Sequence, residues 1–364
     1  MTAPAGIPRA PGPGRAERLR IFILKPSSLG DVIQALPVLR LIKRHLPGSE
    51  VFWWIDSGLA PLLEGDPDLT GLIEFPRRRW ASVWHWGEAC QSVRRVRDLR
   101  FDWVIDLQSL LRSAVMAWLA NGSATIGLDD PREGARGFYD VAVPRPSAQT
   151  HAVDWYLQVL PHLGVPANQP FTWLPRRPRP AEEIAERWHP AEARWIAVQP
   201  GARWENKRWP ASSFRAALIR LAHLLPEFHF AILGSEGDRP LGESLAEAVP
   251  ARCLDLTGRT SLPQMIEWLR VCELLITNDT GPMHVADALG KPVVSMFGPT
   301  DPRRTGPYSQ RERALQHHSL PCVPCLKDTC RWPQPMECLR ALTPERVVEE
   351  VLARLDQVAA PTTP

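Results

Sequence analysis

The chain has 364 residues, enough for two ordinary α/β domains or one large one. Hydrophobic residues make up 44% and charged residues 23%, and a net charge of only +3 gives no reason to expect a nucleic-acid partner. Residues 1–18 lack the apolar core of a signal peptide and are predicted to be a disordered tail. No apolar run approaches the roughly 20 residues of a membrane-spanning helix, so we expect a cytoplasmic protein with reduced cysteines.

Short β-rich runs alternate with amphipathic stretches, which is typical of parallel sheets covered by helices. We assign residues 19–175 to an N-terminal Rossmann-like domain. A helix is expected from Asp31 to His45. Strands are expected at Leu19–Lys25, Val51–Ile55, Asp102–Asp106, Ala124–Gly127 and Val141–Val143.

A proline-rich stretch, Leu174 to Pro180, interrupts this pattern. Because its prolines lack an amide donor, we predict an interdomain linker at residues 176–190. A second Rossmann-like domain is assigned to 191–342, and an amphipathic closing helix and tail to 343–364. The expected strands of the second domain are Trp195–Gln199, His229–Leu233, Leu274–Thr277 and Pro292–Phe297. Two such α/β domains facing each other would place a ligand cleft at the carboxyl ends of their strands.

The first candidate site is the loop from Lys25 to Asp31, between an expected strand and an expected helix. Ser28 and Gly30 permit a tight turn whose amides are available to a ligand. Asp31 is well placed to take a proton from an acceptor hydroxyl. It could equally be a first-turn carboxylate that only complements the helix dipole.

The second candidate runs from Gln199 to Pro210 and again joins a strand to a helix. Gly201 lets the chain turn, and the basic side chains of Arg203, Lys207 and Arg208 could meet a diphosphate. The alternative is an exposed basic loop that Trp209 anchors to the core.

The third candidate is Thr277 to Ala286, where a buried strand meets a helix. Asp279, Thr280 and His284 gather beside Gly281, and Pro282 suits the first turn. A ligand site explains this density of polar groups better than capping alone. Glu236, directly after another strand, could accept hydrogen bonds from ribose hydroxyls or lie in a solvated turn.

Two further clusters have open interpretations. Close cysteines in a reduced compartment suggest a structural zinc site, with unbound thiols or an opportunistic disulfide as the alternative. The cysteines concerned are Cys322, Cys325, Cys330 and Cys338. Runs of arginine indicate either a solvated face or a site for an anionic substrate. These are Arg77, Arg78 and Arg79, followed by Arg94, Arg95, Arg97 and Arg100.

Taken together, the segments 25–31, 200–210 and 278–286, with Phe297–Thr300, resemble glycosyltransferase family 9, the lipopolysaccharide heptosyltransferases. The resemblance spans Leu19 to about Leu355. In the first half, the segments 77–80, 105–113 and 150–153 are similar to members that add the first heptose to Kdo, whereas the cysteine-rich segment looks like other members.

The resemblance implies a GT-B fold, an ADP-heptose donor and inverting transfer without a required cofactor or metal. It also implies that Asp31 is the general base and that Lys207 stabilises the leaving diphosphate. The implied donor contacts are Gly201, Ala202, Arg203, Lys207, Glu236, Asp279, Thr280, Gly281, Pro282 and His284. The implied contacts with a lipid A–Kdo or heptosylated acceptor are Lys25, Ser28, Gly30, Arg77, Arg78, Arg79 and Arg112. Ala202 and Arg203 depart from the small hydroxyl residues of some relatives.

Three other functions fit the same residues: a transferase with a UDP- or GDP-linked donor, a GT-B epimerase, and a non-catalytic sugar-nucleotide binding protein. A lipid-linked acceptor and the arginine run also make a peripheral contact with the inner face of the inner membrane plausible.

Overall fold

A computed structural model describes residues 19–80, 82–168 and 170–359. The predicted disordered tail, residues 1–18, lies outside this part of the chain. The chain divides into two compact units between Pro175 and Arg176. Within the described residues, no helix is both long and apolar enough to cross a membrane.

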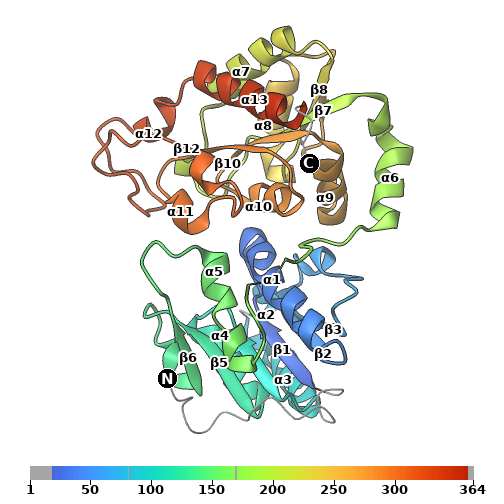
Figure 1. Ribbon diagram of the computed structural model, residues 1–364, viewed down its shortest axis with the longest axis vertical. Coiled ribbons are helices and arrows are strands. Elements are labelled where there is room, and N and C mark those ends of the chain that lie inside the picture. Colours follow the sequence, from blue (N-terminus) through green and yellow to red (C-terminus); the bar gives the residue numbers. More distant parts are fainter. Residues whose placement is uncertain (1–18, 81, 169, 360–364) are drawn as a thin grey trace. The chain divides into compact units, whose positions relative to one another are not determined.

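The first unit contains a six-stranded parallel sheet (Figure 1). In spatial order its strands are β3 (Gly71–Phe75), β2 (Glu50–Asp56), β1 (Arg20–Leu24), β4 (Trp103–Asp106), β5 (Ala124–Asp129) and β6 (Val141–Pro144). β1 is buried nearly throughout, as its run of apolar residues predicts. The five strands predicted in this half are confirmed. β3 was not predicted, because it is a short strand at the sheet edge with only one fully buried side chain.

Helices cover the sheet of the first unit. α1 (Leu29–His45) packs with α5 (Ala152–Leu157), and α3 (Trp86–Asp98) packs with α4 (Leu111–Ala120). Phe22 and Leu24 of β1 share a hydrophobic cluster with Val96 of α3 and Met116 of α4. A short helix, α2 (Arg77–Trp80), precedes α3.

The sheet of the second unit repeats the topology of the first and is also parallel. Its strands in spatial order are β12 (Leu315–Gln316), β11 (Val293–Phe297), β10 (Leu274–Asn278), β7 (Arg194–Gln199), β8 (Phe228–Ile232) and β9 (Cys253–Asp255). The four strands predicted here are confirmed. In both units the strand order reverses next to the first strand, and ligands of open α/β sheets bind at such a switch point.

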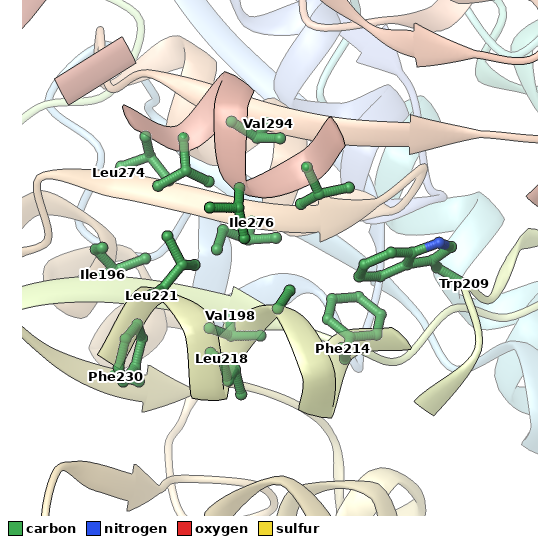
Figure 2. Close-up of a cluster of buried hydrophobic side chains, with 14 of the residues drawn as sticks. Ile196, Val198, Trp209, Phe214, Leu218, Leu221, Phe230, Leu274, Ile276 and Val294 are labelled. Carbon is green, nitrogen blue, oxygen red and sulfur yellow. The ribbon is translucent and has the colours of Figure 1, made fainter. Parts of the chain in front are cut away.

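The core of the second unit lies between its sheet and two helices, α7 (Ala211–Leu224) and α13 (Pro344–Ala359). Figure 2 shows Ile196 and Val198 of β7 beside Leu218 of α7, with Trp209 at one end of the cluster. The predicted closing helix is confirmed as α13, whose Val351 is fully buried in this core. The other helices are α8 (Arg239–Ala246), α9 (Leu262–Val271), α10 (Gly281–Ala288), α11 (Pro302–Thr305) and α12 (Glu337–Arg340).

The residues predicted as a linker, 176–190, include helix α6 (Pro178–Trp188). Pro178 and Pro180 lie in the first turn of this helix, where amides have no intrahelical partner, so prolines that cannot continue a helix can begin one. α6 packs on α9, with Ile184 buried and the rings of Trp188 and Trp268 6.0 Å apart. This segment is therefore a packed part of the second unit.

Candidate functional site

Asp31 lies in the first turn of α1, at the carboxyl end of β1. Its Oδ2 accepts hydrogen bonds from the backbone amide of Ser28 at 2.9 Å and from the Ser28 hydroxyl at 2.7 Å. Asp31 thus forms a capping box with Ser28 in the first turn of the helix, where a carboxylate also complements the helix dipole. Asp31 is half-buried, whereas Ser28 is exposed and Gly30 is buried.

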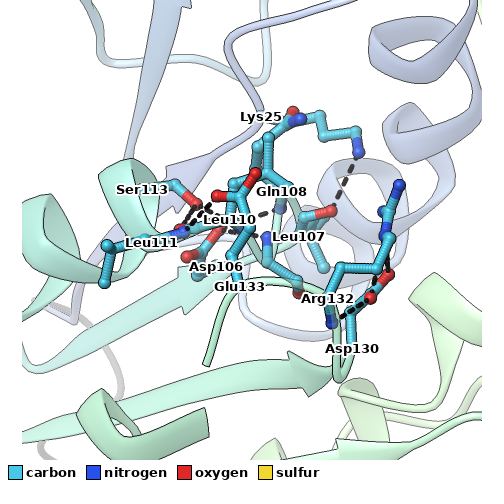
Figure 3. Close-up of polar contacts among 11 residues, drawn as sticks. Lys25, Asp106, Leu107, Gln108, Leu110, Leu111, Ser113, Asp130, Arg132 and Glu133 are labelled. Carbon is cyan, nitrogen blue, oxygen red and sulfur yellow. Dashed lines mark hydrogen bonds and ion pairs between the residues drawn. The ribbon is translucent and has the colours of Figure 1, made fainter. Parts of the chain in front are cut away.

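Lys25 ends up inside the first unit, with only 4% of its surface exposed. Its ammonium donates to the carbonyl of Leu107 at 2.9 Å (Figure 3). It also lies 4.8 Å from the centre of the Tyr156 ring. Burial opposes the charge of Lys25, but Tyr156, Asp31 and Asp106 outweigh it and raise the pKa of the lysine. Burial raises the pKa of Tyr156. Lys25, predicted to bind the acceptor, therefore contributes an internal positive charge near Asp31.

The loop after β4 is held by a buried carboxylate that the sequence did not single out as a site residue. Asp106 Oδ1 accepts from the amides of Gln108 at 2.8 Å and Ser109 at 3.1 Å, and Oδ2 accepts from the Tyr139 hydroxyl at 2.8 Å. Burial raises the pKa of Asp106 despite these bonds. Asp106 thus shapes the loop that receives the Lys25 ammonium.

A second cation close to Asp31 comes from the loop after β5. Arg132 forms a bidentate pair with Asp130, with Nη2 to Oδ2 at 2.8 Å (Figure 3). This hydrogen-bonded pair raises the pKa of Arg132, and the charge of Asp31 raises it further. Loops after β1, β4 and β5 thereby bring charged groups to one sheet edge.

The four arginines predicted to bind the acceptor are all exposed. Arg77, Arg78 and Arg79 form α2, and Arg79 pairs with Glu88 at 2.5 Å. Arg112, at the start of α4, lies 5.9 Å from the centre of the Phe75 ring. Arg79 lines a hollow of about 590 Å³ between β3, α2 and α3, whose lining does not include Asp31. The structure thus associates these arginines with the outer strand β3 rather than with the loop after β1.

Lys207, in the loop after β7, forms an ion pair with Asp279 from the loop after β10. Nζ lies 2.6 Å from Asp279 Oδ2, and the two side chains are 18% and 6% exposed. The Lys207 ammonium also lies 4.7 Å from the centre of the Trp204 ring. The Thr300 hydroxyl donates to the same Asp279 oxygen at 2.5 Å. Lys207 and Asp279, two predicted site residues that lie 72 positions apart in the chain, are therefore in direct contact. Thr300 also belongs to this site, although it was not among the predicted residues.

Asn278 connects the same two loops through buried hydrogen bonds. Its Oδ1 accepts from the amide of Trp209 at 2.9 Å, and its Nδ2 donates to the carbonyl of Pro200 at 2.7 Å. The two ends of the Lys207 loop are thus fastened to the end of β10. No local sequence signal gives Asn278 this role, because its partners are distant in the chain.

The start of the Lys207 loop, at Gly201, lies close to the loop after β8. A side chain at Gly201 would collide with the carboxylate of Asp238, so glycine is needed here for close approach. Asp238 in turn accepts from the Ser235 amide at 2.9 Å. Ala202 is buried and Arg203 is exposed, so of these two only the arginine side chain projects outward. Glu236, predicted near a ribose, is exposed and paired with Arg239 at 2.8 Å.

α10 begins beside Asp279 and carries the rest of the third motif. Thr280 occupies the N-cap position without a side-chain capping bond, and Gly281 and Pro282 form the first turn. Pro282 has no amide N–H, and the amide of Met283 donates to the carbonyl of Thr280 at 3.1 Å. The positive end of the helix dipole at this start favours an anion. His284 is buried on the same helix, at 9% exposure.

The four clustered cysteines are free thiols lining one cavity, together with Trp332 and Met336. Burial, reinforced by the neighbouring thiols, raises the pKa of Cys338 to about 11. Among the residues the structure describes, no three His, Cys, Asp or Glu side chains are grouped so that they could hold a metal ion. The structural zinc site therefore stays a prediction without support from this arrangement.

Residues 90–335 match the family described as glycosyltransferase family 9 (heptosyltransferase). The chain belongs to this family. It is a glycosyltransferase, as the resemblance implied, and its two Rossmann-like units confirm the predicted GT-B fold.

The relatives are similar over nearly the whole chain. Lipopolysaccharide heptosyltransferase 1 of Pseudomonas aeruginosa is 31% identical, covering 93% of this chain and 98% of the relative. Lipooligosaccharide heptosyltransferase 2 of Haemophilus influenzae is 27% identical, covering 82% and 88%. An E. coli heptosyltransferase solved with ADP-2-deoxy-2-fluoro heptose superimposes with a TM-score of 0.71 at 23% identity, covering 92% and 99%.

Proposed function

We propose that this glycosyltransferase moves a heptose from ADP-heptose to the Kdo/heptose inner core of lipopolysaccharide with inversion at the anomeric carbon. The observation that carries the proposal is the ion pair of Lys207 with Asp279 at the switch point of the second sheet. It places a cation beside the start of α10, where the positive end of the helix dipole favours a diphosphate.

The donor assignment follows from charge and from one relative. The E. coli heptosyltransferase named above was solved with an ADP-linked heptose analogue. A nucleotide diphosphate becomes more negative as the sugar–phosphate bond breaks, and a fixed cation stabilises that change more than it stabilises the ground state. In our proposal Lys207 supplies this charge, and transfer needs no added metal.

The acceptor side needs a single base. In an inverting displacement, the acceptor oxygen attacks the anomeric carbon from the side opposite the diphosphate. The bond from that carbon to the phosphate oxygen breaks, and its electron pair leaves with ADP. The acceptor proton passes to Asp31, whose position at the strand end suits this role. The charges of Lys25 and Arg132 interact with the Asp31 carboxylate and lie at the same edge of the sheet as this base.

We place the transfer at the first heptose, on Kdo. The support is the relative named heptosyltransferase 1, which is 31% identical over almost the whole chain. The exposed arginines of α2 and Arg112 would contact the acidic groups of such an acceptor.

A transfer assay with purified protein, ADP-heptose and Kdo₂–lipid A tests the proposal, with product mass as the readout. We expect the addition of one heptose, unchanged by a chelator. Asp31→Asn should slow transfer about 10²–10⁴-fold, the usual contribution of a general base. Asp56→Asn is the matched control, because Asp56 is a half-buried carboxylate at the end of the neighbouring strand β2.

Other outcomes would overturn separate parts of the proposal. Transfer only from a UDP- or GDP-linked sugar would contradict the donor. Transfer only to an acceptor that already carries heptose would contradict the assigned step. Full activity of Asp31→Asn would contradict the base.

A further inference from the structure

The outer surface of α3 and α4 exposes large aromatic side chains. Trp84, just before α3, is 89% exposed, Trp86 on α3 is 60% exposed, and Trp118 on α4 is 61% exposed. Leu111 at the start of α4 is 46% exposed. Side chains of this size are normally covered in a folded protein, so their exposure together indicates an interaction surface. We call these four residues and the arginines beside them the α3–α4 face.

The fold explains why these side chains point outward. α3 and α4 pack against each other and turn Val96 and Met116 toward the sheet. On α4, Leu111 and Trp118 are seven residues apart, which is two helical turns, and so share the side opposite Met116. The aromatic stripe is therefore not part of the core, and replacing it should leave the core intact.

The same surface carries strong positive charge. From residue 77 to residue 100 there are seven arginines and only two acidic residues. All seven arginines are exposed. Among the described residues, Arg79 has an ion-pair partner, Glu88, whereas no ion pair is found for Arg94 or Arg97. On α3, Arg94 and Arg97 lie on the same side of the helix as Trp86.

Exposed tryptophans among arginines match the chemistry of a bilayer surface. Tryptophan prefers the headgroup region, where its ring is half in hydrocarbon and its N–H remains hydrated. Arginine is attracted to anionic phospholipid headgroups. We propose that the α3–α4 face docks on an anionic phospholipid bilayer, with Trp84, Trp86 and Trp118 at headgroup depth and the arginines on lipid phosphates. This contact goes beyond the proposed sugar transfer, and its test involves no transfer.

Co-sedimentation of the full-length protein with vesicles tests this contact. Vesicles of phosphatidylcholine alone are compared with vesicles containing phosphatidylglycerol, each at low and at high salt. We expect binding at least about tenfold stronger to the anionic vesicles, and weaker binding at high salt, because salt screens the arginine charges.

Two variants separate the contribution of the tryptophans to vesicle binding from that of the arginines. Replacing Trp84, Trp86 and Trp118 together by serine should weaken vesicle binding at least about tenfold at both salt concentrations, because the hydrophobic part is lost. Arg94→Gln with Arg97→Gln should remove most of the salt-dependent part. The matched controls are Ile219→Ser with Leu224→Ser, and Arg179→Gln with Arg346→Gln, which change exposed residues of the second unit. Circular dichroism verifies that each variant is folded.

Three results would overturn the proposal. The first is equal binding of the wild-type protein to neutral and anionic vesicles. The second is unchanged binding of the tryptophan variant. The third is binding to a single-stranded oligonucleotide but not to vesicles, since stacking aromatics and basic residues can also serve nucleic acid.

Discussion

The loops after β1 and β7 occupy equivalent positions in the two sheets, yet they are held in different ways. In the first unit, Asp31 is fixed by Ser28, three residues away. In the second unit, Lys207 is fixed by Asp279, 72 residues away, and Asn278 holds the ends of its loop. The base thus depends on local helix-start geometry, whereas the diphosphate cation depends on contacts between distant segments.

The largest effect is expected when the Lys207 ammonium, the cation of the loop after β7, is removed. Lys207→Met should lower kcat/KM about 10²–10³-fold, because a preorganised charge on the leaving group is lost. Steady-state transfer kinetics measure this effect. Lys327→Met, which removes an exposed lysine of the same unit, is the control and should keep the wild-type rate. A Lys207→Met enzyme with wild-type kcat/KM would remove this lysine from the proposed chemistry.

Asn278→Ala tests the long-range attachment of the same loop. It leaves the Trp209 amide and the Pro200 carbonyl without their buried partner. We expect the free energy of unfolding to fall by about 2–6 kcal/mol, given roughly 1–3 kcal/mol for each of the two buried groups left unsatisfied. Urea denaturation measures the change. An unchanged midpoint would mean that the β7 loop does not depend on Asn278.

Ser28→Ala tests the local attachment in the first unit. The variant loses the hydroxyl bond to Asp31 but keeps the backbone amide bond. The free energy of unfolding should therefore fall by only about 0.5–1.5 kcal/mol, the net value of one ordinary hydrogen bond. The same urea titration serves as the readout. A larger loss than in Asn278→Ala would reverse the proposed contrast between the two loops.

Thiol labelling compares the reactivity of one cysteine in each unit and needs no substitution. Cys90 is exposed on α3, whereas burial raises the pKa of Cys272, in the second unit, to about 12. Because only the thiolate reacts, iodoacetamide at pH 8 should modify Cys90 readily and Cys272 hardly at all. Peptide mass spectrometry after timed labelling measures both rates. Equal labelling of the native protein would contradict the burial of Cys272.

The predictions from sequence succeeded where the signal is local. Buried β-branched runs gave nine strands, and strand–turn–helix transitions located Asp31, Lys207 and Asp279 at strand ends. The contact of Lys207 with Asp279, and the roles of Asn278 and Thr300, depend on which strands become neighbours, and no short segment encodes that. The polar helix α3 and the edge strand β3 also lacked a strong apolar pattern.

The surroundings of Lys25 could not be predicted from its local sequence. The family resemblance implied that Lys25 contacts the acceptor, and the fold buries its side chain against Leu107 and Tyr156. Tyr156 and Tyr139 come from segments with no motif of their own, so the charged surroundings of Asp31 emerge only in three dimensions.

In our proposal the two loops divide the work, since the loop after β1 supplies the base and the loop after β7 supplies the cation for the donor. A comparison of ADP-heptose binding with single-turnover transfer tests this division. Calorimetry and quenched-flow assays are run side by side on Asp31→Asn and Lys207→Met. We predict that Asp31→Asn binds the donor as the wild-type protein does but transfers its sugar far more slowly, whereas Lys207→Met is impaired in both. Loss of donor binding in Asp31→Asn, or normal transfer by it, would contradict this division.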